Sequence, residues 1–303
     1  MTRGPAGIVA VSGASGLLGS ALLPALRAAG WIPRPLVRRA AAADEVQWDP
    51  AVGTLDLKAL EGVTAAVHLA GESIAAGRWT AEAKRRIRES RIQGTRLLAE
   101  SLARLRVRPR VLVTASAVGI YGDRGDTPLD ETSDLGTDFL ARVGQEWEAA
   151  AQPAVDAGIR VVPLRFGIVL AREGGALPRM LTPFRMGVGG PLGSGRQWMS
   201  WIAIDDAVAA VLEALRNEAA RGPINAVAPE PVRNAEFAAR LGEALGRPAI
   251  IPAPAFALRA LFGEMADGAL LASQRVLPVR LTALGFHFKY PTLPETLEAI
   301  LGR

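Results

Sequence analysis

The segment "AVSGASGLLGS", residues 10–20, joins a predicted strand to a predicted helix through glycines 13, 16 and 19. An apolar run over 8–12 precedes the turn, and 17–29 follows it with apolar side chains at helical spacing. The start of a helix offers unpaired amide groups and a positive dipole end, which favour an anion. The spacing is G-x-x-G-x-x-G, so it matches the G-x-G-x-x-G fingerprint only in part. The prediction of a bound dinucleotide therefore depends mainly on the position of the glycine turn between a strand and a helix.

Composition narrows the classes of function. The chain has 303 residues, half of them hydrophobic, which is enough for one large or two moderate domains. It contains no apolar run of membrane-spanning length and no signal-peptide pattern, so we expect a cytoplasmic protein without a membrane partner. It contains no cysteine and only two histidines, His68 and His287, so no metal site is expected. The 35 Lys and Arg against 30 Asp and Glu are scattered, so no nucleic-acid partner is expected.

Strand-like and helical segments alternate along the first half of the chain. This alternation predicts an α/β protein, a Rossmann doubly wound parallel sheet with a smaller α+β substrate domain. We expect the dinucleotide-binding domain over 1–170, with strands near 224–228 returning to it, and mainly the substrate domain and a C-terminal extension over 171–303. Residues 172–197 hold many glycines and prolines and predict a long loop. The expected strands are 8–12, 32–37, 65–70, 111–116 and 160–166, and the long helices are 80–105 and 137–157.

The end of the second strand indicates which dinucleotide is bound. Enzymes that use NAD place an acidic residue there for the ribose 2′-hydroxyl, whereas this chain has Arg38 and Arg39. A guanidinium presents a planar fork of donors that suits a 2′-phosphate. The sequence therefore favours NADP(H), the alternative being that both arginines form only a solvated strand exit.

Several motifs, in this order and spacing, resemble one known family. They are "VSGASGLLG" at 11–19, "VHLAGE" at 67–72, "TASAVGIYG" at 114–122, "PLRFGIVL" at 163–170 and "GSGRQWMSWIAIDD" at 193–206. The chain is similar to extended short-chain dehydrogenase/reductases, and within them to the NAD-dependent epimerase/dehydratase subgroup. That subgroup carries a C-terminal extension like "GEMADGALLASQRVLPVRLTALGFHFKYP" at 263–291. The resemblance covers nearly the whole chain, and it implies a substrate domain packed over the nicotinamide.

The resemblance also implies which residues contact the cofactor and that the protein forms a homodimer. It places the cofactor phosphates on the glycine turn, the 2′-phosphate on Arg38, the adenosine side on "LAG" and the nicotinamide on "RFGIV". The homodimer would form through 80–105 and 137–157. The expected cofactor residues are Gly13, Ser15, Gly16, Leu17, Leu18, Gly19, Arg38, Arg39, Leu69, Ala70, Gly71, Thr114, Phe166 and Val169.

The proton-transfer pair of the family is missing. The resemblance implies a tyrosine and, four residues later, a lysine, but the aligned residues are Phe139 and Val143, which exchange no proton. Ser116 or Thr114 would orient the substrate oxygen. The candidates that remain for proton transfer include Tyr121, in the "YG" turn, and Glu72, which is either a buried carboxyl near the nicotinamide or an ordinary exposed loop acid.

Two interpretations of the function remain open. Relatives that act on nucleotide sugars carry an arginine where this chain has Met199, which lowers the expectation of a sugar nucleotide. The first interpretation is an NADP(H)-dependent oxidoreductase or epimerase-like enzyme acting on a small carbonyl or hydroxyl compound. The second is a non-catalytic NADP(H)-binding redox sensor or regulator that kept the fold.

Overall fold

The computed structural model describes residues 6–302, and its centre is an eight-stranded sheet of order β12-β8-β6-β5-β1-β2-β3-β4. All neighbours pair in parallel except β3 and β4. Together with the flanking helices, this sheet confirms the predicted Rossmann architecture. The strands are β1 (Gly7–Ser12), β2 (Trp31–Val37), β3 (Val46–Asp49), β4 (Thr54–Leu55), β5 (Val63–His68), β6 (Val111–Ala117), β8 (Arg160–Phe166) and β12 (Ile224–Ala226).

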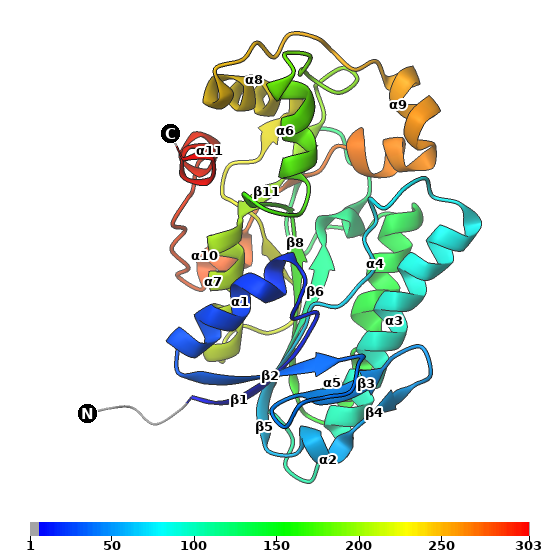
Figure 1. Cartoon of the computed structure of the whole chain (residues 1–303), viewed down its shortest axis with the longest axis vertical. Helices are drawn as coiled ribbons and strands as arrows, with labels where there is room; N and C mark the ends of the chain where they lie inside the picture. Colours follow the sequence, from blue (N-terminus) through cyan, green and yellow to red (C-terminus); the bar gives the residue numbers. More distant parts are fainter. Residues whose placement is uncertain (1–5, 303) are drawn as a thin grey trace.

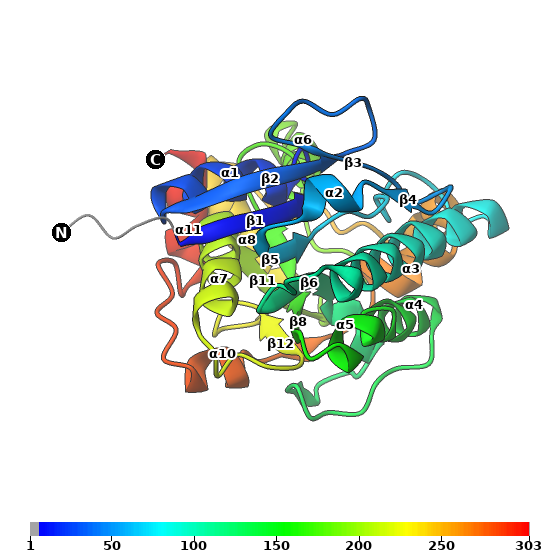
Figure 2. The same cartoon turned by 90° about the horizontal axis from the view of Figure 1, so that it is seen from below.

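Helices cover both faces of this sheet (Figures 1 and 2). On one face lie α1 and α7, and on the other lie α3, α4 and α5. The inner strands are apolar along their length, as expected when both faces are buried. The helices of this part of the chain are α1 (Leu17–Ala28), α2 (Leu57–Leu60), α3 (Ala81–Arg104), α4 (Phe139–Ala149), α5 (Gln152–Asp156) and α7 (Ile204–Arg216). The 3-10 turn η1 is Val118–Tyr121.

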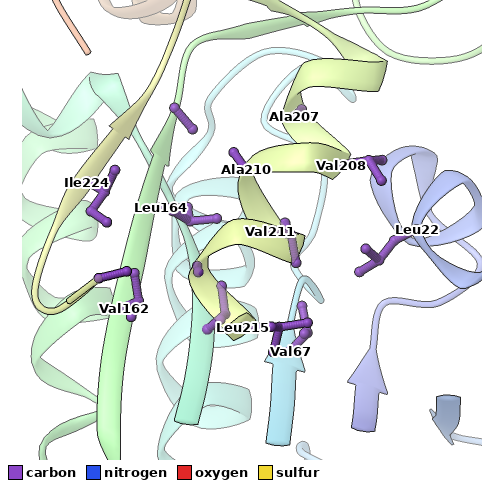
Figure 3. Packing of buried hydrophobic residues seen from close by; sticks show 14 of the residues in the cluster. Leu22, Val67, Val162, Leu164, Ala207, Val208, Ala210, Val211, Leu215 and Ile224 are labelled. Atoms are coloured by element: carbon purple, nitrogen blue, oxygen red, sulfur yellow. The ribbon is translucent and has the colours of Figure 1, made fainter. Parts of the chain in front are cut away.

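The main core forms where α1 and α7 pack side by side on one face of the sheet (Figure 3). Leu22 of α1, Val67 of β5 and Val211 of α7 are fully buried there. A second apolar cluster on the opposite face joins the sheet to α3 and α5. Burial of both clusters holds the carboxyl ends of β1, β5 and β6 at one common edge.

The second lobe is smaller and lies above that edge (Figure 1). Its core packs Phe184, Trp201 and Phe237. Its helices are α6 (Leu177–Arg185), α8 (Asn234–Leu245), α9 (Ala255–Phe262), α11 (Leu293–Leu301) and the π-helical turn η2 (Ala266–Leu270). Its short strands and those that join the lobes are β7 (Pro128–Leu129), β9 (Ile168–Leu170), β10 (Trp198–Met199), β11 (Trp201–Ala203), β13 (Val232–Arg233) and β14 (Arg275–Val276). Helix α10 (Val279–Ala283) instead packs against β12 of the large sheet, with Leu281 in the main core.

The C-terminal extension is tied back onto the rest of the chain. Strand β14 pairs in parallel with β7. The buried carboxylate of Asp206 accepts hydrogen bonds from the amides of Lys289 and Tyr290, at 2.7 and 3.0 Å. Asp206 therefore anchors the extension, a role beyond the helix capping that its place at the start of α7 suggests.

Three local expectations were wrong, and two short strands were not expected. The helix expected over 137–157 breaks into α4 and α5, because Pro153 cannot donate the next helical hydrogen bond. The expected loop over 172–197 contains α6, whose apolar face outweighs the glycines around it. The amphipathic pattern of 252–278 predicts that Leu261 covers the substrate domain, but this side chain is 65% exposed. The short strands β3 and β4 carry no strong alternating pattern and were not predicted.

No helix within residues 6–302 is both long enough and apolar enough to span a membrane.

Candidate functional site

The glycine turn forms a backbone cradle at the carboxyl end of β1. Gly13 has φ +69°, and a Cβ there would lie 2.7 Å from the amide nitrogen of Ala70. A Cβ on Gly19 would lie 2.1 Å from the carbonyl oxygen of Gly13. Both positions therefore require glycine.

The start of α1 is open for an anion. Gly16 is the N-cap and provides no side-chain hydrogen bond, so the first amides of the helix keep their donors for a ligand. Ser15 and Gly16 are exposed, and Leu17 and Leu18 are half-buried. The expected phosphate-binding residues thus share one turn, and the cradle that a Cβ would fill fits the diphosphate of a dinucleotide.

A buried hydrogen-bond pair fixes the next strand against this turn. The Ser12 hydroxyl accepts from the amides of Leu69 and Ala70, at 3.2 and 3.4 Å, and shares a 2.6 Å hydrogen bond with Nδ1 of His68. Burial lowers the pKa of His68 to about 4, so the imidazole is neutral. Because the Ser12 oxygen already accepts from two amides, its own proton is directed to Nδ1 of His68. His68 is thus a buried strand histidine that positions "LAG".

Of the two arginines after β2, one is ion-paired and the other is exposed. Arg39 forms a two-point ion pair with Glu45, at 2.6 and 2.7 Å, and this hydrogen bonding lowers the pKa of the Glu45 carboxyl. Arg38 is exposed, and no carboxylate within residues 6–302 pairs with it. The structure therefore leaves Arg38 available for a 2′-phosphate, whereas Arg39 is already engaged. The resemblance already implied Arg38 for the 2′-phosphate, but the ion pair of Arg39 with Glu45 could not be predicted, because it forms only through the fold of the loop.

Ser116 and Tyr121 belong to one buried network. The Ser116 hydroxyl donates to the Glu148 carboxylate at 2.7 Å, and Glu148 forms a two-point ion pair with Arg165. Arg165 donates to the Tyr121 hydroxyl at 2.9 Å, which in turn donates to Asn225 at 2.7 Å. Sequence reasoning did not find this network, because its members come from separate segments of the chain.

The geometry does not favour Tyr121 as a proton donor. Its side chain has no exposed surface, burial raises its pKa, and its hydroxyl has a partner on each side. Ser116 is also nearly buried. Both residues therefore hold β6, β8 and α4 together, and neither reaches the exposed edge of the sheet.

Glu72 lies apart from this network, in the loop after β5. Its carboxylate accepts from Nε of Arg86 at 3.1 Å, and its side chain is 37% exposed. The other expected contacts differ in exposure. Val169 is half-buried, whereas Phe166 is 8% and Thr114 1% exposed. Thr114 pairs in register with His68 inside the sheet, so burial removes it from the surface that a cofactor would touch.

The positions of the missing pair are apolar. Phe139 packs against Trp79, with ring centroids 5.2 Å apart, in a cluster that includes Phe262 and Met265 of the extension. Val143 is 4% exposed. Lys84 lies with Nζ 5.0 Å from the centre of the Phe139 ring and pairs with Glu264. The C-terminal extension therefore packs onto the helix position where the resemblance implies a tyrosine.

Four large apolar side chains near Met199 in the sequence could line an apolar pocket, but they do not lie together. Phe184 and Trp201 lie in the core of the second lobe, Met186 is 72% exposed and Trp198 is half-buried. A different contact links this lobe to the glycine turn, because a Cβ on Gly175 would lie 2.8 Å from Cδ2 of Leu17. The glycine-rich segment after β9 thus reaches the start of α1.

The parallel sheet, the glycine cradle at its carboxyl edge and the second lobe above it define a dinucleotide-binding protein of the extended short-chain dehydrogenase/reductase type. The chain belongs to the NAD dependent epimerase/dehydratase family, whose model matches residues 9–227. A second family model, a domain of unknown function (DUF1731), matches residues 253–300, which lie in the C-terminal extension.

Similar proteins extend over nearly the whole chain. The epimerase family protein ML0860 of Mycobacterium leprae is 43% identical over 96% of this chain and 94% of its own length. The crystal structure of human epimerase family protein SDR39U1 (isoform 2) with NADPH has a TM-score of 0.90 and 36% identity, and the match covers 97% of this chain and 99% of that one. A nucleoside-diphosphate sugar epimerase from Corynebacterium glutamicum has a TM-score of 0.82 and 38% identity, covering 98% of this chain and 58% of that one.

Proposed function

We propose that the protein is an NADP(H)-dependent oxidoreductase or epimerase-like enzyme that acts on a small carbonyl or hydroxyl compound. The observation that carries the proposal concerns the two arginines after β2. Arg39 is ion-paired with Glu45, whereas Arg38 is exposed. Since β2 runs parallel to β1, Arg38 and the glycine cradle lie at the same edge of the sheet. The NADPH in the structure of the human relative supports the same cofactor. When bound, NADP(H) supplies a hydride donor or acceptor.

The chain's own residues would bind and orient this cofactor. The amides at the start of α1 would hold the diphosphate, Arg38 the 2′-phosphate, and Leu69, Ala70 and Gly71 the adenosine side. Glu72, at the exposed edge, is the group we propose for proton transfer.

A second function is a non-catalytic NADP(H)-binding sensor in the cytoplasm, acting alone or as a homodimer. The apolar packing of Phe139 against Trp79 and the extension favours it, because the usual site of proton transfer is filled. One relative of Arabidopsis thaliana is named as chloroplastic, so the compartment differs within the family.

Turnover separates the two functions. NADPH oxidation is followed by its absorbance with a panel of small aldehydes, ketones and quinones, using the wild type and Glu72→Gln. The enzyme proposal expects turnover of at least one compound and about a 100-fold lower kcat in Glu72→Gln, since a general base contributes about that much. Tight NADPH binding without turnover of any compound would favour the sensor.

A further inference from the structure

Arg91 of α3 is a half-buried cation directly behind the loop that follows β5. Its Nη1 donates to the carbonyl oxygens of Glu72 and Ile87, at 2.9 and 3.0 Å. Its guanidinium lies 5.0 Å from the ring of Trp147 on α4. These contacts hold the guanidinium in one place.

No carboxylate within residues 6–302 forms an ion pair with Arg91. Glu72 gives its carboxylate to Arg86 and only its backbone oxygen to Arg91. Burial lowers the pKa of Arg91 to about 10, and the charge of Glu72 partly offsets that effect. A cation removed from water without a counter-ion is costly, so the site is complementary to an anion.

Gly71, in the loop after β5, lies directly against this cation. Gly71 is exposed, and a Cβ on it would lie 3.5 Å from Cζ of Arg91. The preceding residue, Ala70, is one that Gly13 of the glycine turn closely approaches. A continuous line of contacts thus runs from the diphosphate cradle through Ala70 and Gly71 to the guanidinium.

The cradle itself contains no positively charged side chain. Residues 13–20 read "GASGLLGS", and the first turn of α1 offers only backbone amides. A pyrophosphate diester carries more negative charge than the partial charge of a helix end can balance. Arg91, a buried cation without a counter-ion, is therefore a neighbour of the glycine cradle, an anion site without a cationic side chain.

We propose that Arg91 supplies the positive charge for the pyrophosphate of the bound cofactor, next to Gly71. This inference rests on the proposed function, because it assumes that NADP(H) occupies the crevice. It also bears on the missing lysine of the family pattern. Trp147, which the guanidinium contacts, lies one helical turn beyond Val143, so Arg91 brings a cation to the side of α4 where the lysine is missing.

The test compares two ligands by isothermal titration calorimetry. NADPH contains the pyrophosphate, whereas adenosine 2′,5′-bisphosphate contains the adenosine and the 2′-phosphate without it. We expect Arg91→Gln to weaken NADPH about 10- to 100-fold, the range for a hydrogen bond to a charged group, and to change the bisphosphate less than about threefold. Arg91→Lys keeps the charge and should recover most of the NADPH affinity.

Arg86→Gln is the matched control, because Arg86 lies on the same helix, contacts the same loop and is half exposed. It should leave both affinities near the wild-type values. The inference is overturned if Arg91→Gln weakens both ligands equally, if it weakens neither, or if Arg91→Lys behaves like Arg91→Gln. If wild-type protein binds neither ligand, the proposed function itself fails, and that outcome is distinct because it needs no variant. Should Arg91→Gln not fold, Arg91→Met, which keeps the aliphatic length of the side chain without its charge, takes its place with the same expected results.

Discussion

At the scale of single residues, His68 couples the cofactor edge to pH. Its side chain has no exposed surface, and Nε2 has no hydrogen-bond partner within the described residues. Burial lowers its pKa to about 4 in the folded chain, against 6.5 for an ordinary histidine. As the pH falls from 6.5 toward 4, the unfolded chain therefore takes up a proton before the folded chain does.

We predict that His68 has no effect on the pH dependence of stability above pH 6.5. As the pH falls to about 4, it lowers the free energy of unfolding by about 3 kcal/mol. Urea unfolding at about pH 7 and again at about pH 4 measures this loss of unfolding free energy. His68→Asn should lose less stability between the two conditions than the wild type. The exposed His287 is the control, and His287→Asn should follow the wild type. Equal losses in wild type and His68→Asn would show that the histidine does not carry the effect.

The residue scale also shows what the sequence could predict of the site. The glycines, Arg38 and "LAG" were identifiable because local spacing and strand order place them at one edge. The ion pair of Arg39 with Glu45, the burial of Thr114 and the cation at Arg91 were not, since each depends on how a loop or a helix folds back onto a strand.

At the scale of elements, the strand–turn–helix unit at the start of the chain depends on Gly19. A methyl group there would overlap the Gly13 carbonyl and contact Ala14 at 2.8 Å, both of them backbone atoms that cannot move aside cheaply. We predict that Gly19→Ala destabilises the fold by about 2 kcal/mol and weakens NADPH binding at least about 10-fold, because the helix must shift away from the turn.

Gly77→Ala is the control for this prediction. A methyl group on Gly77 would have no neighbour within 4 Å, and Gly77 has no positive φ, so its variant should match the wild type. Thermal unfolding and NADPH titration of both variants give the measurement. If Gly19→Ala matched Gly77→Ala, the close packing of helix and strand would not be essential.

Most elements of the sheet were predictable for simple reasons. Buried parallel strands are continuously apolar, and α3 starts at a side-chain cap, where the Thr80 hydroxyl accepts from the amide of Ala83. The elements that were missed are short or unusual in composition. β3 pairs over only two positions with β2, and α6 lies among glycines.

At the scale of the whole molecule, Trp79 joins two distant parts of the chain. Its ring contacts Phe139, packs with Met265, and leaves no room for a side chain at Gly268, where a Cβ would lie 2.8 Å from Cζ3. The "RW" motif at 78–79 and the "GEMADG" motif at 263–268 are thus two halves of one contact. Neither motif predicted the other, because no local pattern encodes a pairing so distant along the chain.

We predict that Trp79→Ala destabilises the fold by about 3–5 kcal/mol, the usual cost of removing a buried large aromatic ring. Because the lost contact lies on the extension, limited proteolysis should cut within 255–270 sooner than in wild type. Phe256→Ala is the control, since Phe256 is 75% exposed on the same extension. Unchanged melting and proteolysis in Trp79→Ala would contradict a joining role for this residue.

The central claim is that the glycine cradle and Arg38 together bind NADP(H). Calorimetric titration of the wild type and of Arg38→Gln with NADPH and with NADH tests it most directly. We predict that the wild type binds NADPH at least about 10-fold more tightly than NADH, and that Arg38→Gln removes this preference without weakening NADH. Equal affinity of the wild type for both cofactors, or no binding of either, would contradict the claim.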